Sequence, residues 1–233
     1  MNEEKKKSIA LVFGNTGGIG RSIFESLVSS KKYCKVFGLN RSYTPYIDVT
    51  NEDNIKELAS NLIEKDLSIE LLFNATGYLH DNSFSPEKKI QDINLHYMRK
   101  SFEINTYANA LLIKHLAPLM KKESKSIFAS LSARVGSISD NFLGGWYSYR
   151  ASKAALNQII KTASIEFKIK NKNLIFVAIH PGTVYTKLSK PFAGNKTLMS
   201  CDEAAKKILS VINNLTIEDS GYLIDYKNQK IQF

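Results

Sequence analysis

Tyr149 and Lys153 are the two residues whose types and spacing most directly suggest acid–base chemistry. A spacing of four residues places both side chains on the same face of a helix. A phenol titrates near pH ~10, and a neighbouring ammonium group favours the phenolate, which brings proton transfer closer to neutral pH. Tyr and Lys also occur at this spacing by chance on solvated helices, so the pair needs a second feature beside it.

A glycine-rich segment, Gly14-Asn15-Thr16-Gly17-Gly18-Ile19-Gly20, supplies that second feature. It follows the apolar run 9–13 and precedes apolar residues at helical spacing over 22–30. Glycines allow the backbone to approach phosphates, and the N-terminus of a helix attracts an anion. The position predicts a dinucleotide pyrophosphate site, although such turns also join strands to helices without a ligand.

The segment Gly38-Leu39-Asn40-Arg41-Ser42 indicates which dinucleotide the chain would bind. An acidic residue after the second strand suits the ribose 2′-hydroxyl of NAD, whereas a basic residue suits the 2′-phosphate of NADP. The segment holds no carboxylate that would compete with Arg41, so NADP(H) is expected in preference to NAD(H). A solvated surface arginine is the alternative interpretation.

The elements that position these residues alternate along the chain. Strands are expected at 9–13, 35–39, 46–49, 69–73, 126–131, 174–179 and 222–226, and helices at 22–30, 51–64, 90–122 with a kink at Pro118, 147–170 and 202–213. This alternation predicts an α/β chain with a single-domain Rossmann fold. Its sheet would be doubly wound, mostly parallel and seven-stranded, with helices on both faces. One domain would span residues 1–233, with 1–7 as a flexible basic tail.

Composition narrows the function classes. The 233 residues are 43% hydrophobic, which is enough for a sizeable core and excludes a disordered or disulfide-stapled chain. The net charge of +10 raises the question of nucleic acid, but the lysines are spread along the chain without an arginine cluster, so no nucleic acid is expected. Two distant cysteines and four histidines predict no metal site. No run approaches the ~20 apolar residues of a membrane span, so a cytoplasmic protein without a membrane partner is expected.

Taken together, these motifs resemble the short-chain dehydrogenase/reductase family over nearly the whole chain. The matching motifs, in the family's order, are Gly14-x-x-x-Gly18-Ile19-Gly20, Asp48-Val49, Asn74-Ala75-Thr76-Gly77, Asn105, Tyr149-x-x-x-Lys153 and Pro181-Gly182-x-x-x-Thr186. Within the family, the segments 131–138 and 144–153 are similar to those of the C-factor and sniffer-type carbonyl reductases.

The resemblance implies a role for each matched residue. Tyr149 would exchange a proton with the substrate oxygen, Lys153 would lower the tyrosine pKa and hold the nicotinamide ribose, and Asn105 would hold a water. Thr186 and the backbone of Val184 would fix the nicotinamide carboxamide. The residues expected to contact the cofactor are Gly14, Asn15, Thr16, Gly18, Ile19, Gly20, Asn40, Arg41, Asp48, Val49, Asn74, Ala75, Thr76, Gly77, Tyr149, Lys153, Pro181, Gly182, Val184 and Thr186.

Two assignments stay open at the level of sequence. The family's catalytic serine lies three residues before a glycine, which lands on Ala133 when counted back from Gly136. The end of the preceding strand favours Ser132 instead, with Ser130 and Ser137 as alternatives. Asp48 would either contact adenine, as the resemblance implies, or cap the helix that begins near residue 51.

The expected function is an NADP(H)-dependent oxidoreductase that transfers hydride between nicotinamide and a small-molecule carbonyl or alcohol. Family likeness implies a homodimer or homotetramer. The alternative is a C-factor-like signalling or regulatory protein in which turnover is secondary. Substrate recognition would come from the segments 77–86, 142–147 and 187–199, the last of which is expected to act as a lid.

Overall fold

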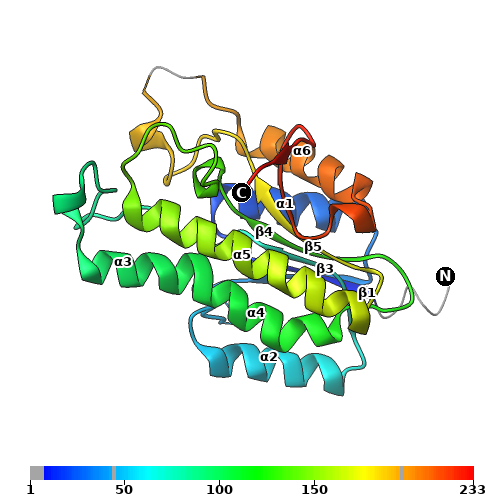
Figure 1. Cartoon of the computed structure of the whole chain (residues 1–233). Helices are drawn as coiled ribbons and strands as arrows, with labels where there is room; N and C mark the ends of the chain where they lie inside the picture. Colours follow the sequence, from blue (N-terminus) through cyan, green and yellow to red (C-terminus); the bar gives the residue numbers. More distant parts are fainter. Residues whose placement is uncertain (1–7, 44–45, 195–196) are drawn as a thin grey trace.

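The computed structural model of the chain describes residues 8–43, 46–194 and 197–233. These residues build one seven-stranded sheet with helices on both faces (Figure 1). The strand order is β2-β1-β3-β4-β5-β6-β7, and all neighbours are parallel except β6 and β7. The strands are β1 Ser8–Phe13, β2 Lys35–Leu39, β3 Ser68–Asn74, β4 Ser126–Leu131, β5 Leu174–His180, β6 Tyr222–Asp225 and β7 Lys230–Ile231. The predicted fold class is confirmed.

The central strands are mostly apolar because both of their faces are covered. In β1, Ile9, Leu11 and Phe13 belong to one core, and the alternating Ala10 and Val12 belong to the other. The helices α2 Glu52–Glu64, α4 Ala108–Leu116 and α5 Tyr147–Lys170 cover the first core, whereas α1 Gly18–Ser30 and α6 Cys201–Asn214 cover the second (Figure 1).

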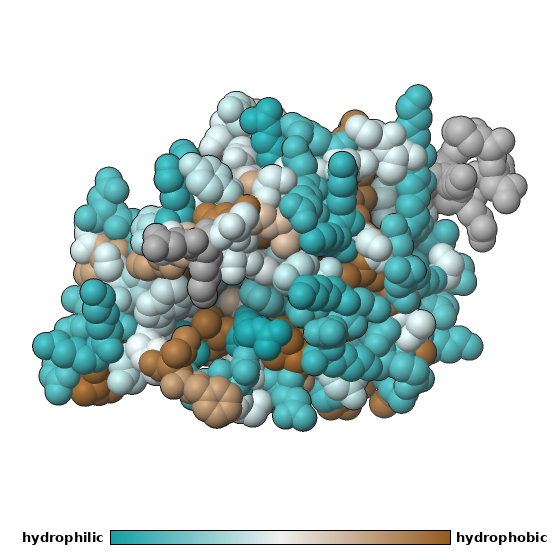
Figure 2. Space-filling model, turned by 90° about the horizontal axis from the view of Figure 1, so that it is seen from above, coloured by the Kyte–Doolittle hydropathy of each residue, from teal (hydrophilic) through white to brown (hydrophobic). Residues whose placement is uncertain are grey.

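Three of the helices begin at a residue whose side chain caps them. Asn51, Asn94 and Ser200 accept hydrogen bonds from first-turn N–H groups of α2, α3 Leu95–Phe102 and α6, respectively. No helix among the described residues is long and apolar enough to cross a membrane. Seen from above, the surface is mostly hydrophilic, with apolar side chains in separate groups (Figure 2).

The strand predicted over residues 46–49 is wrong. Tyr46 forms a single isolated bridge with Asn40, and the chain then turns through Val49 and Thr50 so that Asn51 can cap α2. The seventh strand is instead β7, which pairs antiparallel with β6. Two residues are too few to show an alternating pattern, so no sequence pattern indicated β7.

The continuous helix predicted over residues 90–122 is also wrong. A 3₁₀ turn at Ile90–Asp92 precedes α3, and a π-helical turn at Glu103–Tyr107 separates α3 from α4. Pro118 lies in a terminal 3₁₀ turn, Ala117–Leu119, where the helical region ends rather than kinks. The apolar spacing remains helical across the π turn, which is why the pattern did not reveal it.

Phe176 on β5 is fully buried in the hydrophobic core, and its ring centroid lies 5.5 Å from that of Phe128 and 5.3 Å from that of Phe167. Phe176→Ala is expected to lower the free energy of unfolding by about 3–5 kcal/mol, because it leaves a cavity between the sheet and α5. Urea unfolding followed by circular dichroism measures the loss. Phe142→Ala, at a position 86% exposed, is the control and is expected to change stability by less than about 0.5 kcal/mol. Equal losses in both variants would contradict the core assignment.

Candidate active site

Two adjoining cavities open where the parallel strands end. The first, about 620 Å³, is lined by the glycine turn at residues 16–20, the segment 75–77 after β3, and Lys153. The second, about 500 Å³, is lined by residues 132–135 after β4, residues 143–146 before α5, and the loop after β5. Ser132 and Tyr149 belong to the walls of both cavities. A group held in one cavity would therefore meet a group held in the other beside these two hydroxyls.

The glycine turn fits closely against the segment after β3. Gly14 has a φ of 78°, in the left-handed region that favours glycine. A Cβ on Gly20 would collide with the carbonyl oxygen of Gly14 and would lie 2.9 Å from Cβ of Ala75. The N-terminus of α1 borders the first cavity through Gly18, Ile19 and Gly20. This cradle suits the pyrophosphate of a dinucleotide, because an anion there meets a helix N-terminus.

The structure brings most of the predicted cofactor residues to the cavities. The first cavity is lined by Thr16, Gly18, Ile19, Gly20, Ala75, Thr76, Gly77, Tyr149, Lys153, Pro181 and Thr186. Gly182 and Val184 line the second cavity. The predicted residues that lie outside the lining of both cavities are Gly14, Asn15, Asn40, Arg41, Asp48, Val49, Asn74 and Asn105.

The segment after β2 corrects one expectation. A carboxylate does compete for Arg41, because Asp48 Oδ2 lies 3.8 Å from Arg41 Nη1 once the chain folds back after Tyr46. The arginine side chain is 64% exposed, so this ion pair is weak and open to exchange. Asp48 Oδ1 accepts hydrogen bonds from the backbone and hydroxyl of Thr50, and it is Asn51, not Asp48, that caps α2.

Tyr149 and Lys153 lie on the first two turns of α5, and both are buried. Lys153 Nζ donates a 2.9 Å hydrogen bond to the carbonyl oxygen of Leu131 and lies 5.8 Å from the centroid of the tyrosine ring. Burial raises the pKa of Tyr149 and lowers the pKa of Lys153 to about 7. The expected lowering of the tyrosine pKa is therefore not produced by these protein groups alone, because desolvation and the nearby Tyr97 both raise it.

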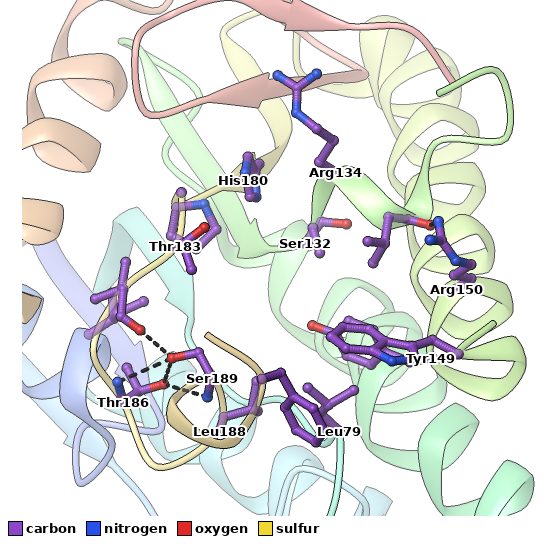
Figure 3. Close-up of a pocket in the computed structure, with 18 of the residues that line it drawn as sticks. Leu79, Ser132, Arg134, Tyr149, Arg150, His180, Thr183, Thr186, Leu188 and Ser189 are labelled. Atoms are coloured by element: carbon purple, nitrogen blue, oxygen red, sulfur yellow. Dashed lines mark hydrogen bonds between the residues drawn. The ribbon is translucent and has the colours of Figure 1, made fainter. Parts of the chain in front are cut away.

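Ser132 is the candidate serine that lies beside Tyr149 (Figure 3). Its hydroxyl donates a 2.8 Å hydrogen bond to Asn157 Oδ1, and Asn157 in turn donates to the carbonyl of Gly136. The alternatives, Ser130 and Ser137, lie outside the lining of both cavities. Ser132 is thus placed to reach a substrate oxygen at the boundary between the cavities.

Asn105 is fully buried in the π-helical turn. Its side chain accepts a hydrogen bond from the N–H of Tyr78 and donates to the carbonyl of Tyr78 and to Ser152 Oγ, all at 2.8–3.0 Å. Its own carbonyl accepts a 3.0 Å hydrogen bond from Asn109 Nδ2. Asn105 therefore joins the segment after β3 to α5, and its role in holding a water stays a prediction.

Asn109 was not singled out from the sequence, yet it connects three elements of the site. Its Oδ1 accepts from Asn74 Nδ2 at 2.8 Å and from Ser130 Oγ at 2.7 Å. All three side chains are buried, so these bonds satisfy groups that would otherwise be costly to desolvate. The spacing of four from Asn105 was the available signal, because it places both amides on one helical face.

Glu87 was also missed. Its buried carboxylate accepts hydrogen bonds from the N–H and the hydroxyl of Ser148, and its carbonyl accepts from the N–H of Trp146. It thereby caps the N-terminus of α5 from a distant loop, where a carboxylate also interacts favourably with the positive end of the helix dipole. The signal in the sequence was Trp146, which precedes the helix and cannot accept these hydrogen bonds itself.

The loop after β5 forms part of the wall of the second cavity. Phe192 packs edge-on against Trp146 and His80, with ring-centroid distances of 5.2 Å to each. All three segments expected to recognise substrate contribute to this cavity, through Leu79, through Leu143, Gly144 and Trp146, and through Leu188, Ser189 and Phe192. Asn195, part of the expected lid, lies outside the described residues, and the lid function stays a prediction.

Comparisons with known proteins agree with this geometry. The family model described as enoyl-(acyl carrier protein) reductase matches residues 33–224. A relative from Rhodococcus sp. (strain AD45), 1-hydroxy-2-glutathionyl-2-methyl-3-butene dehydrogenase, is 31% identical over 76% of this chain and 74% of its own.

Two solved structures share the fold over nearly the whole chain. The NADPH-bound carbonyl reductase from chicken fatty liver has a TM-score of 0.84 at 25% identity, covering 97% of this chain and 94% of its own. The carbonyl reductase Sniffer of D. melanogaster also has a TM-score of 0.84, at 22% identity, covering 97% and 99%.

The lowered pKa of Lys153 predicts a pH-dependent stability. The unfolded lysine keeps its proton up to about pH 10.5, whereas the folded one releases it near pH 7. The unfolded chain therefore binds more protons within this window, and stability rises with pH. Between pH 7 and 9 the wild type should gain about 2 kcal/mol relative to Lys153→Met.

Urea unfolding at both pH values measures this gain. Lys168→Met, which changes an exposed lysine on the same helix, is the matched control and should follow the wild type at both values. A difference between the wild type and Lys153→Met that stayed constant from pH 7 to 9 would show that the buried lysine titrates normally.

Proposed function

The chain belongs to the short-chain dehydrogenase/reductase family, and from this premise we propose that it transfers hydride between NADP(H) and the carbonyl or alcohol group of a small molecule. The observation that carries the proposal is that Ser132 and Tyr149 border both cavities. The first cavity would hold the cofactor on the glycine turn, and the second would hold the substrate. Hydride transfer needs the two in contact, and the shared wall is where they would meet.

In this proposal Tyr149 is the proton donor for carbonyl reduction. Its raised pKa keeps the phenol protonated near neutral pH, ready to donate a proton to the substrate oxygen. Ser132 would donate a hydrogen bond to the same oxygen and stabilise the negative charge that develops there. Bound NADPH would supply the hydride to the carbonyl carbon.

Lys153 would hold the ribose of the nicotinamide and stabilise the phenolate left on Tyr149. A lysine whose pKa is about 7 exists in both protonation states at neutral pH, so it can also return a proton to the tyrosine. The hydrogen bond to Leu131 keeps the ammonium group at the end of β4, close to Ser132. In the oxidation direction the same groups would act in reverse.

Arg41 supports the preference for NADP(H) over NAD(H). Its exposed guanidinium would exchange the weak pair with Asp48 for the 2′-phosphate, which carries more charge and accepts bidentate hydrogen bonds. The chicken carbonyl reductase, which shares the fold, is described with NADPH bound. The homodimer or homotetramer and the cytoplasmic location stay predictions.

The first test concerns the two hydroxyls. Tyr149→Phe is expected to bind NADPH, seen as a change in cofactor fluorescence, but to lose turnover with aldehydes, ketones and quinones. Ser132→Ala is expected to lower turnover by about 10²–10³-fold, because one donor to the developing charge is lost. Steady-state oxidation of NADPH at 340 nm measures both.

Ser137→Ala is the control for Ser132, since Ser137 lies outside both cavity walls. Full activity in Tyr149→Phe would contradict the mechanism. A biological effect that survives in this inactive variant would instead favour the signalling alternative.

The second test concerns the cofactor. Arg41→Ala is expected to raise the KM for NADPH by about 10-fold or more while leaving the KM for NADH nearly unchanged, because only NADPH carries the 2′-phosphate. Initial rates with both cofactors measure the ratio. An equal rise for both cofactors, or a wild type that prefers NADH, would refute the role of Arg41.

A further inference from the structure

We propose that the substrate cavity selects a carbonyl or alcohol compound that carries a carboxylate, and that Arg150 is the partner of this carboxylate. The proposal rests on the proposed function and names the substrate class for the same site. Among the described residues, the wall of the second cavity includes the basic side chains Arg134, Arg150 and His180 but no aspartate or glutamate.

Arg150 is a partly buried cation next to Tyr149. Its Nε donates to the carbonyl of Gly145 at 3.0 Å, and its Nη1 donates to the carbonyl of Val135 at 3.4 Å. These bonds orient the guanidinium between two loops of the cavity wall. Its other N–H groups have no hydrogen bond to any described residue, and no ion pair joins Arg150 to a described carboxylate.

Among the described residues of the cavity wall, Arg150 is the cation that lies near a carboxylate, Asp140, but forms no ion pair with it. Arg134 is paired with Asp140 at 3.2 Å and with the buried Asp225 at 3.7 Å. Burial lowers the pKa of His180 to about 4, so this histidine is neutral near pH 7. Burial also lowers the pKa of Arg150, and the nearby Asp140 offsets this only in part. A partly desolvated guanidinium that is not in an ion pair gains from a carboxylate, which it can bind with two parallel hydrogen bonds.

The other residues of the cavity wall indicate that the remainder of the substrate molecule is apolar. Leu79, Val135, Leu143, Trp146 and Phe192 give this wall a mainly apolar character. Figure 3 shows Tyr149 and Ser132 near the centre of the pocket and Arg150 at its margin, where the side chain reaches from α5 toward the segment after β4. An apolar, flat molecule with its carbonyl at Tyr149 and its carboxylate at Arg150 matches this arrangement of charge and apolar surface.

The experiment compares two aldehydes of nearly the same shape, 4-formylbenzoate and its methyl ester, with NADPH as the reductant. In the wild type, kcat/KM for the carboxylate is expected to exceed that for the ester by about 10-fold or more. Arg150→Met is expected to lower kcat/KM for the carboxylate by about 10- to 100-fold and to change that for the ester by less than about 3-fold. Arg150→Lys should restore part of the preference, because it keeps the charge without the planar fork.

Arg99→Met removes the same charge from an exposed position on α3, outside both cavities, and is expected to keep the wild-type ratio. The ester separates the possible failures. A wild type that reduces the ester as well as or better than the carboxylate would overturn the selection of an anion. Equal losses for both aldehydes in Arg150→Met would show that Arg150 only holds the two loops together. Absence of turnover with both aldehydes and with the neutral carbonyl panel would instead count against the proposed function itself.

Discussion

The burial of Lys153 is the constraint on which the site depends. A buried ammonium loses its hydration, and the hydrogen bond to the carbonyl of Leu131 returns only part of that loss. The hydrogen bond to Leu131 also fixes α5 against the end of β4. Tyr149, one turn earlier on α5, and Ser132, one residue beyond β4, are thereby brought to a common wall. The burial of Lys153 thus lowers the stability of the fold while it arranges the site.

Buried amides and one carboxylate hold the elements around this lysine. Asn105 and Asn109 connect the segment after β3, the end of β4 and α5 through hydrogen bonds between fully buried groups. Glu87 fixes the first turn of α5 from outside the helix. Each of these buried groups has a hydrogen-bond partner. The network therefore favours one specific arrangement of the helices over other compact arrangements. The π-helical turn contributes by turning Asn105 toward the segment after β3.

Charge in this protein acts locally. The 32 basic residues outnumber the 22 acidic ones and are mostly lysine, and some of them form exposed ion pairs of small effect. The cations that differ from this background are few. Lys153 is buried, and Arg150 borders the second cavity and forms no ion pair with a described carboxylate. Their surroundings, rather than the net charge, distinguish them from the surface lysines.

The sequence by itself determined the strand–helix order, the glycine turn and the Tyr149–Lys153 pair, because these depend on local spacing. The strand expected at 46–49 and the unbroken helix at 90–122 failed because a cap at Asn51 and a π turn at Glu103–Tyr107 leave the apolar pattern unchanged. Only the tertiary structure decided what depends on burial and on contacts between distant residues. These include the position of Ser130 and Ser137 outside both cavity walls, the approach of Asp48 to Arg41, the cap from Glu87 and the direction of the tyrosine pKa. Desolvation and long-range hydrogen bonds have no signature in residue spacing, since they arise only when the chain is folded.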